Sequence, residues 1–388
     1  MRMLVLGAGQ QGSACAYDLL VHTDHEVVLA DLRVDPLPAL LRPHVGPRLR
    51  TVRVDAEDRR SVEIALEGVA ATMSAFPYYY NAELAAAAIG AGSHFCDLGG
   101  NTEIVLRQKE LDGRARERGV SVIPDCGVAP GMVNILAEHG IRQLDRPRAV
   151  RIKVGGLPQN PRPPLNYQVV YSMEGVLDYY TTRSLVLRDG EPVQVEALSE
   201  VEELDFPGVG RLEAFHTAGG LSTMAQRYRG KLETMEYKTL RYPGHAAAMR
   251  AIRDLGLLDS EPVDVKGAAV APRDLFLARV GPELRRDPHE SPDLVALRVE
   301  VEGERAGRPV TLRWDLLDRY DPEAGVTAMM RTTGYSLAIT GHLQALGSIE
   351  PGVWTPDEVV PAERYIAELR RRGIDIRATE LVTGGAEA

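Results

Sequence analysis

The sequence predicts an α/β protein, with an N-terminal doubly wound parallel sheet and a second α+β domain that holds a mixed sheet. Short apolar runs alternate with helical patterns over the first third of the chain, as in parallel strands joined by helices. A glycine-rich turn follows the first run, and after Pro124 the alternation gives way to proline-rich loops and longer runs. We therefore expect domains at 1–126 and 127–326, followed by a helical region at 327–388.

Six short apolar runs predict the strands of the first sheet. They are brief and largely uncharged, as parallel strands covered on both faces are. The runs are Leu4–Leu6, Val27–Ala30, Val52–Val54, Ala70–Met73, His94–Asp97 and Val120–Ile123. Helices are predicted between them, among them Ser13–Leu20 and Thr102–Arg118. Asn101 or Thr102 is suited to cap the second helix, and Gly119 is suited to end it.

The second half of the chain has a different pattern. We expect 155–164 to be a proline-rich loop, too irregular for a buried strand. Strands are predicted at 185–187 and 193–195, and a hairpin is predicted from 294–302 and 310–316 around turn residues 303–307. A long helix is expected at 327–346, bounded by Gly347, and a last one at 361–372.

Composition excludes several classes of protein. The chain of 388 residues has 45 basic and 55 acidic residues, and its net charge of -10 argues against binding along a nucleic-acid backbone. Three cysteines without a CxxC pair fit a reducing cytoplasm. The apolar start is too short for a signal peptide, and no apolar run is long enough to span a membrane. We expect a soluble cytoplasmic protein with a small-molecule substrate and neither nucleic-acid nor membrane partners.

The motif Gly7-Ala8-Gly9-Gln10-Gln11-Gly12 is a GxGxxG placed between the first strand and the first helix. Gly7 permits the tight turn, Gly9 lets backbone N–H groups approach a pyrophosphate, and Gly12 lets the helix pack closely. Asp31 follows Gly12 by 19 positions, where an acid that binds ribose belongs. These features predict a Rossmann domain that binds a nicotinamide dinucleotide.

The choice of dinucleotide depends on Asp31 and Arg33. Asp31 accepts hydrogen bonds from ribose hydroxyls and repels a 2′-phosphate, which favours NAD; Arg33 could pair with that phosphate, which leaves NADP as the less favoured cofactor. Asp55 is a candidate for the adenine edge or a turn cap, and Phe76 for cofactor contact or packing. The full set of expected cofactor residues is Gly7, Gly9, Gln10, Gln11, Gly12, Asp31, Leu32, Arg33, Asp55, Ala75, Phe76 and Pro77.

Candidate chemistry lies at the carboxyl ends of later strands, where open α/β sheets bind ligands. Asp97 follows the fifth strand and Cys126 follows the sixth. Asp97 is either an acid–base group or a turn aspartate, and Cys126 is either a reactive thiol or a small packing residue.

The segments 213–220 and 238–245 hold a dense group of polar residues in the second domain. Extended alternation places Thr239 and Arg241 on one side and Lys238 on the other. Arg241 is suited to a bidentate grip on a substrate carboxylate, or else to a surface salt bridge. The nine histidines are scattered and no cysteines cluster, so we predict no metal.

The segments just described resemble the saccharopine dehydrogenase-like family. The resemblance rests on GAGQQG, DLGGN, DCGVAPGMVN, EAFHTAGG and KTLRYPGH, of which the last three are the most specific. It implies a Rossmann domain, a mixed α/β domain, C-terminal helices that return to the Rossmann side, and a homodimer or higher oligomer. Within the family, the motifs look most like the lysine 6-dehydrogenase branch. That branch uses NAD to deaminate the ε-carbon of L-lysine to the semialdehyde, which cyclises to a piperideine carboxylate as ammonia leaves.

The resemblance also suggests roles for individual residues. Thr239 and Arg241 match positions that meet the substrate, and Arg241 alone would suffice for the single carboxylate of lysine. Candidates for the general base are Asp97, Glu213 and Lys238, and further candidates for substrate contact are Cys126, Asn101, Glu174 and His245. Three alternatives stay open: a saccharopine dehydrogenase, a carboxynorspermidine dehydrogenase-type enzyme, and a non-catalytic sensor that binds NAD.

Overall fold

The computed structural model describes residues 1–382, and the chain divides into two compact units. Unit 1 comprises Met1–Arg142 and Met330–Ile376, and unit 2 comprises Gln143–Met329 and, among the described residues, 377–382. The first division falls 16 residues after the expected 126/127 boundary. Helix α6 (Met132–Ile141) belongs to unit 1 because it contacts the later helices α12 (Pro356–Val359) and α13 (Ala362–Arg371).

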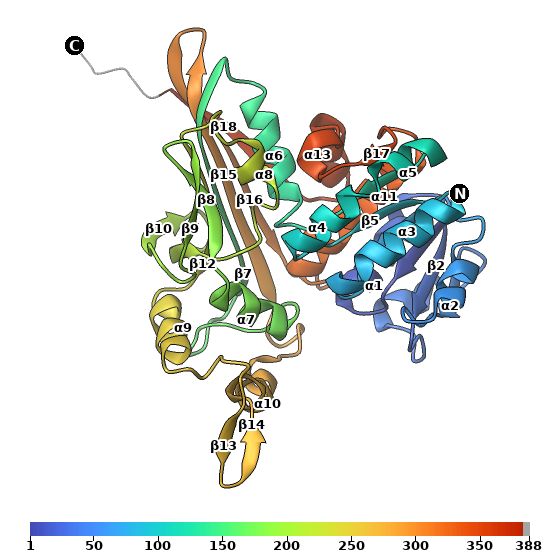
Figure 1. The fold of residues 1–388 in the computed structure, drawn as a ribbon, viewed down its shortest axis with the longest axis horizontal. Helices are drawn as coiled ribbons and strands as arrows, with labels where there is room; N and C mark the ends of the chain where they lie inside the picture. The colour runs from blue at the N-terminus through green and yellow to red at the C-terminus, as the bar shows by residue number, and fades with distance from the viewer. Residues whose placement is uncertain (383–388) are drawn as a thin grey trace. The chain divides into compact units, whose positions relative to one another are not determined.

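Unit 1 is built on a seven-stranded parallel sheet in the order β17-β6-β5-β4-β1-β2-β3. Helices of the same unit surround it (Figure 1). The strands are β1 (Arg2–Leu6), β2 (Glu26–Asp31), β3 (Leu49–Arg53), β4 (Ala71–Ser74), β5 (His94–Asp97), β6 (Ser121–Ile123) and β17 (Gly352–Val353). The six predicted strands are confirmed to within a few residues. The strand order reverses between β1 and β4, which is where doubly wound sheets bind ligands.

Helices cover both faces of this sheet. Helices α1 and α11 contact each other on one face, whereas α2, α3 and α5 contribute to the apolar core on the other. The helices are α1 (Gln10–His22), α2 (Arg59–Ala65), α3 (Asn81–Ala91), α4 (Thr102–Lys109), α5 (Asp112–Arg118), α11 (Tyr335–Ala345), α12 (Pro356–Val359) and α13 (Ala362–Arg371). Asp18 of α1 and Arg372, just after α13, form a fully buried bidentate ion pair, with N–O distances of 2.6 and 2.9 Å.

Two predicted helices differ in detail from the structure. The helix expected at 102–118 is two helices, α4 and α5, and it ends as expected at Gly119 in the left-handed conformation. The helix expected at 327–346 contains a π-helical turn at Met330–Gly334, which follows two helical residues and continues as α11. A Cβ at Gly334 would lie 2.7 Å from the carbonyl oxygen of Gln11, so this turn packs directly on α1.

Unit 2 holds a mixed nine-stranded sheet in the order β10-β11-β12-β7-β15-β16-β18, with β8 and β9 branching from β12. Only β12 and β7 are parallel among its registered pairs. The strands are β7 (Arg146–Pro158), β8 (Ser184–Arg188), β9 (Glu191–Val195), β10 (Glu202–Phe206), β11 (Gly210–His216), β12 (Thr234–Arg241), β15 (Asp293–Arg305), β16 (Arg308–Arg319) and β18 (Ile376–Val382). The predicted hairpin is confirmed as β15–β16.

The prediction of a loop over 155–164 is wrong for its first four residues. Strand β7 continues to Pro158 between β12 and β15, and so it is a central strand. Glycine occurs there because the neighbours approach closely: a Cβ at Gly155 would lie 2.5 Å from the Leu240 carbonyl oxygen, and one at Gly156 would lie 2.5 Å from the Met329 methyl group. A side chain at Gly155 would push β7 and β12 apart, whereas one at Gly156 would displace the Met329 and Val170 side chains.

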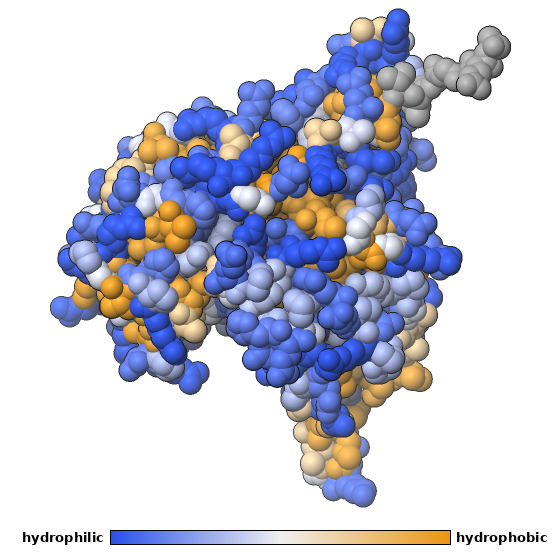
Figure 2. Space-filling model, turned by 180° about the vertical axis from the view of Figure 1, so that it is seen from behind, coloured by the Kyte–Doolittle hydropathy of each residue, from blue (hydrophilic) through white to orange (hydrophobic). Residues whose placement is uncertain are grey.

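The remaining elements of unit 2 are helices α7 (Met173–Thr181), α8 (Met224–Arg227), α9 (His245–Asp254) and α10 (Pro272–Leu284), and a small hairpin of β13 (Val263–Val265) and β14 (Ala268–Val270). The hairpin projects from unit 2 (Figure 1) and carries apolar surface (Figure 2), with Val263 51% and Val265 48% exposed. The oligomer that the resemblance implies stays a prediction. Within residues 1–382, no helix is long and apolar enough to cross a bilayer.

Candidate functional site

The glycine-rich turn of unit 1 leaves room in front of the first helix. Gly7 has φ +108°, and a Cβ at Gly12 would lie 1.9 Å from the Gly7 carbonyl oxygen, so α1 packs tightly against the turn. At Gly9, by contrast, a Cβ would meet no atom of the described residues within 4 Å. The helix begins without a side-chain cap, so its first N–H groups are available to an anion.

Gln11, in the first turn of α1, has buried side-chain amide atoms, and neither Nε2 nor Oε1 has a hydrogen-bond partner within residues 1–382. Buried polar groups normally have partners, so these atoms indicate that a polar ligand is accommodated beside the turn. The open space at Gly9, the uncapped helix and the unpaired amide together fit a dinucleotide pyrophosphate.

Asp31 ends β2, as predicted, but its carboxylate is held by backbone groups. Oδ2 accepts a hydrogen bond from the Ala8 N–H at 2.7 Å, and Oδ1 accepts one from the Arg33 N–H at 3.0 Å. The carboxylate therefore ties the glycine-rich turn to the end of β2. Leu32 and Arg33 are exposed beside it.

The other expected cofactor residues lie just after strands β3 and β4 of the sheet. Asp55 accepts a hydrogen bond from the Glu57 N–H at 3.0 Å, which is the turn-capping role. Phe76 packs against the apolar core of unit 1, which favours the packing interpretation. The Ala75 carbonyl oxygen lies close to Gly7, because an ideal Cβ at Gly7 would be 3.0 Å from it. Pro77 is exposed.

Asp97 is fully buried at the end of β5. Its carboxylate accepts hydrogen bonds from the Gly99 N–H and from the Gln108 amide, both at 2.7 Å. Burial raises the pKa of Asp97 to about 6, because these hydrogen bonds offset only part of the desolvation. This geometry favours a role in holding the turn over direct contact with substrate, and the predicted role as a base is not established.

Asn101 and Cys126 have local roles in the structure. The Asn101 side chain caps α4 by accepting hydrogen bonds from the N–H groups of Glu103 and Ile104, at 2.9 and 3.2 Å. Cys126 is buried, with its sulfur 3.1 Å from the Ile123 carbonyl oxygen, and burial raises the pKa of its thiol. A thiol with a raised pKa is a poor nucleophile, so the geometry favours the packing role.

Arg241 is the central residue of the candidate site in unit 2. It is 3% exposed. Burial raises the pKa of the neighbouring Tyr167 and Tyr180 phenols, so neither supplies a negative charge to the guanidinium. Its Nε donates to the Tyr180 hydroxyl at 3.2 Å and its Nη1 donates to the Leu240 carbonyl at 2.8 Å. Within the described part of the chain, Arg241 forms no ion pair and its Nη2 has no hydrogen-bond partner. A buried guanidinium without a counter-charge is costly, so this position suits an anionic ligand.

Tyr167, Tyr180 and His245 surround the guanidinium. Arg241 lies over the Tyr167 ring, 4.8 Å from its centroid, and the Tyr180 hydroxyl is 2.9 Å from His245 Nε2. His245 Nδ1 is 2.9 Å from the Leu165 carbonyl oxygen, and burial lowers the pKa of His245 to about 3. The histidine is therefore neutral. Sequence reasoning missed both tyrosines, although four tyrosines within residues 167–180 were a signal for an aromatic site.

Other predicted residues lie on the same face of the sheet as Arg241. Thr239 is buried, and its hydroxyl is 2.7 Å from that of Thr217. Glu213 pairs with Arg241 in the β11–β12 register, but its two carboxylate oxygens accept hydrogen bonds from the N–H groups of Gly244 and Ala246, at 3.0 and 2.6 Å. Glu213 thus caps α9, which favours a structural role over that of a base.

Lys238 and Glu174 lie away from the Arg241 group. Lys238 is on the opposite face of β12, where its ammonium donates to the Glu200 carbonyl at 2.9 Å and pairs with Glu202 at 3.4 Å. Glu174 is exposed in the first turn of α7. The structure therefore does not bring these two candidates together with Arg241.

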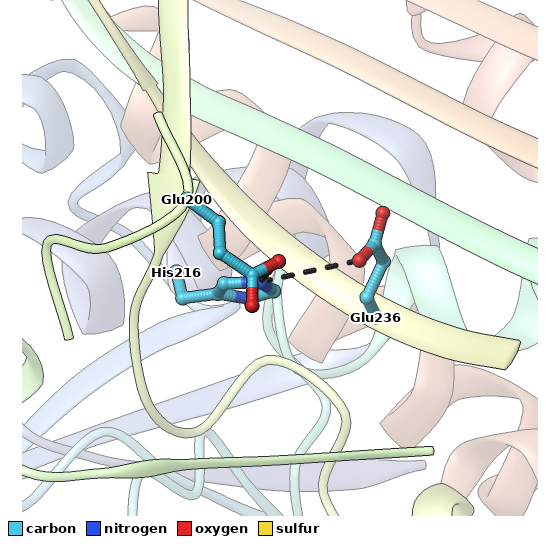
Figure 3. A group of neighbouring side chains, drawn as sticks. All are labelled: Glu200, His216 and Glu236. Atoms are coloured by element: carbon cyan, nitrogen blue, oxygen red, sulfur yellow. Dashed lines mark hydrogen bonds and ion pairs between the residues drawn. The ribbon is translucent and has the colours of Figure 1, made fainter. Parts of the chain in front are cut away.

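Glu200, His216 and Glu236 form a group of possible metal ligands on the Lys238 face, with ligand atoms within 4.8 Å of one another (Figure 3). The guanidinium of Arg188 already contacts all three side chains. It lies 2.7 Å from Glu200, 2.8 Å from Glu236 and 3.3 Å from His216. Arg188 thus supplies the positive charge that a cation would otherwise provide.

Comparison with known protein families matches almost the whole chain. Residues 3–123 match the model described as the saccharopine dehydrogenase NADP binding domain, and residues 127–374 match the model described as the saccharopine dehydrogenase C-terminal domain.

Among curated proteins, the chain is similar to the NADP-dependent, L-glutamate-forming saccharopine dehydrogenases of two yeasts. It is 26% identical to the Schizosaccharomyces pombe protein over 223 residues, covering 55% of this chain and 49% of the relative. It is 23% identical to the Saccharomyces cerevisiae protein over 278 residues, covering 69% and 61%. The chain thus spans about half of the first relative and three-fifths of the second.

Among solved structures, apo saccharopine dehydrogenase (L-Glu forming) from Saccharomyces cerevisiae aligns with a TM-score of 0.80 at 19% identity, covering 98% of this chain and 100% of that one. A homospermidine synthase from Legionella pneumophila, in complex with NAD, aligns with a TM-score of 0.69 at 10% identity, covering 98% and 91%. These likenesses establish the predicted fold class. With both family models matched along its length, the chain belongs to the saccharopine dehydrogenase family.

Proposed function

We propose that the protein is an oxidoreductase that uses a nicotinamide dinucleotide to break a C–N bond of an amino acid, with saccharopine as the substrate. The names of the curated relatives support saccharopine. The observation in this chain that carries the proposal is Arg241, a buried guanidinium with no acidic partner in residues 1–382. A substrate carboxylate would supply the missing charge.

The dinucleotide would bind at the glycine-rich turn, where Gly9 leaves space, the first N–H groups of α1 meet the pyrophosphate, and Gln11 offers its unpaired amide. When bound, it accepts a hydride from the carbon next to the substrate nitrogen. The family description favours NADP. Asp31 keeps NAD as the second candidate, because a carboxylate near the ribose repels a 2′-phosphate.

The residues of unit 2 would hold the substrate. Arg241 binds one carboxylate, and its contacts with Tyr180 and Leu240 fix the plane of the guanidinium. Because the side chain is already ordered, binding costs little further conformational entropy. The nitrogen must lose its proton before its carbon can yield a hydride, and no described residue is assigned to that step.

Oxidative deamination of L-lysine is the second candidate reaction. One observation favours it. Arg241 is the one arginine that its group of described residues buries without an acidic partner, and one arginine matches the single carboxylate of lysine better than the three of saccharopine. In both reactions a carbon–nitrogen bond is oxidised to an imine that water hydrolyses to the same semialdehyde. The leaving amine is glutamate from saccharopine and ammonia from lysine.

The test is an assay of the purified protein with saccharopine, L-lysine and ornithine, each with NAD⁺ and with NADP⁺. Reduced dinucleotide with equal glutamate from saccharopine is the expected result. Reduced dinucleotide with equal ammonia from lysine would establish the second reaction instead. Binding of dinucleotide without turnover of any amino acid would contradict both and favour a non-catalytic sensor or a polyamine-precursor enzyme.

A further inference from the structure

The hydroxyl of Tyr167 is unusual in unit 2 because it is buried without a hydrogen-bond partner. The residue is 3% exposed, and within residues 1–382 its proton has no acceptor, although the Arg241 guanidinium lies close enough to interact with its oxygen. An unpaired buried hydroxyl is less stable than the same group in water, because it loses its hydrogen bonds to solvent and gains none in the protein. Such groups are rare in native proteins, so this one calls for an explanation.

Tyr167 lies beside a second group that lacks a partner. The Arg241 guanidinium lies over its ring at 4.8 Å, and Nη2 of that guanidinium has no hydrogen-bond partner among the described residues. An O–H donor and an N–H donor without acceptors thus occur in one buried group. An anion with two oxygens satisfies both donors at once.

Tyr180 cannot take this role, although it also contacts Arg241. The Leu165 carbonyl can only accept, so Nδ1 of His245 carries the proton and Nε2 is an acceptor. The Tyr180 O–H therefore points to His245, and its oxygen accepts from Arg241. Tyr180 has no proton left for an anion, whereas the proton of Tyr167 is uncommitted.

We propose that the Tyr167 hydroxyl is a substrate-binding group that donates, together with Arg241, to one carboxylate of the amino-acid substrate. This assignment rests on the proposed function. Burial raises the pKa of the Tyr167 phenol, so the group stays a donor at neutral and mildly alkaline pH. Tyr180 and His245 act through Arg241 and are positioning residues.

The first measurement compares the stability of Tyr167→Phe and Tyr242→Phe without substrate. Tyr242 neighbours Arg241 in sequence, and its hydroxyl donates to the Pro158 carbonyl at 2.8 Å. Tyr167→Phe removes a hydroxyl whose proton has no acceptor among the described residues, so its melting temperature should equal or exceed that of the wild type. Tyr242→Phe loses a hydrogen bond and should melt at a lower temperature.

The second measurement titrates the full-length wild type and both variants with saccharopine, L-lysine and cadaverine by calorimetry. Cadaverine is lysine without its carboxylate. Tyr167→Phe should bind the carboxylate-bearing probe about 10- to 100-fold more weakly, as expected for a lost hydrogen bond to a charged group, with the same change in KM in the assay. Cadaverine binding should not change, and Tyr242→Phe should bind every probe as the wild type does.

The outcomes separate this assignment from the proposed function. Unchanged carboxylate binding by Tyr167→Phe, or an equal loss for cadaverine, would overturn the role of Tyr167 alone. A clear loss of stability in Tyr167→Phe would also overturn it, since the hydroxyl would then have a structural partner. Failure of the wild type to bind or turn over any carboxylate-bearing probe would overturn both.

Discussion

Replacing Gly9 with alanine should separate folding from dinucleotide binding. Gly9 has φ -71° and ψ -173°, which alanine adopts freely, and the new methyl would meet no described atom within 4 Å. The free energy of unfolding should therefore change by less than about 1 kcal/mol. The methyl would instead occupy the space in front of the first N–H groups of α1. Loss of one or two hydrogen bonds to a phosphate there would weaken binding by about 3 kcal/mol, or more than 100-fold.

Gly12→Ala is the matched control, because its methyl would collide with backbone. The ideal Cβ lies 1.9 Å from the Gly7 carbonyl oxygen and 2.8 Å from its carbon, and neither atom can move without shifting the turn. This variant should lose at least about 1–3 kcal/mol of stability. Urea unfolding and calorimetric titration with NADP⁺ and NAD⁺ measure both quantities. Normal binding by Gly9→Ala would refute the placement of the pyrophosphate over Gly9, and wild-type stability of Gly12→Ala would refute the close packing of α1.

Three further predictions concern stability. The pKa of Asp97 is raised from 3.8 to about 6, so its contribution to stability is complete below pH 3.8 and is lost as the pH rises through 6. Between pH 4 and pH 7 the free energy of unfolding of the wild type should therefore fall by about 3 kcal/mol relative to that of Asp97→Asn, as measured by urea unfolding. Parallel pH curves for the two proteins would contradict this. Arg372→Met leaves the buried Asp18 carboxylate without its guanidinium and should cost about 3–5 kcal/mol, most of it recovered in the double variant with Asp18→Leu; absence of recovery would show that the pair is not the cause. Gly155→Ala should destabilise unit 2 by about 1–3 kcal/mol, whereas Gly281→Ala, whose methyl meets no described atom within 4 Å, should be neutral or stabilising; equal thermal shifts would contradict the close contact in β7.

The sequence predicted the elements that are marked by residues within them or next to them. The six buried strands of unit 1 are short apolar runs, and Gly119 ends α5 in the left-handed conformation that glycine adopts without strain. The two-residue strand β17 has no such signal, because it exists only through its pairing with β6. Gly155 and Gly156 were misinterpreted for a related reason. Glycine is needed there because Leu240 and Met329, which are distant in sequence, leave no room for a side chain.

The candidate site shows the same division. The glycine-rich turn and Asp31 are a motif of fixed spacing, and their placement follows from it. Arg241 was identified from its residue type, but its lack of an acidic partner emerges only from the folded surroundings. Tyr180 of α7 lies 61 positions before Arg241, the last residue of β12, and no local pattern encodes the contact between them.

The discontinuity of unit 1 has a consequence for synthesis on the ribosome. Residues 1–142 leave the ribosome about 190 residues before the segment that completes their sheet, Met330–Ile376. Until α11 is made, the backbone carbonyls of Phe95 and Ser121 lack the Gln344 amide that bonds to them, and β6 has no outer neighbour. The nascent N-terminal segment therefore presents an open sheet edge and an uncovered apolar face while unit 2 is being translated. An open edge and exposed apolar surface are the features that make incompletely folded chains prone to aggregate.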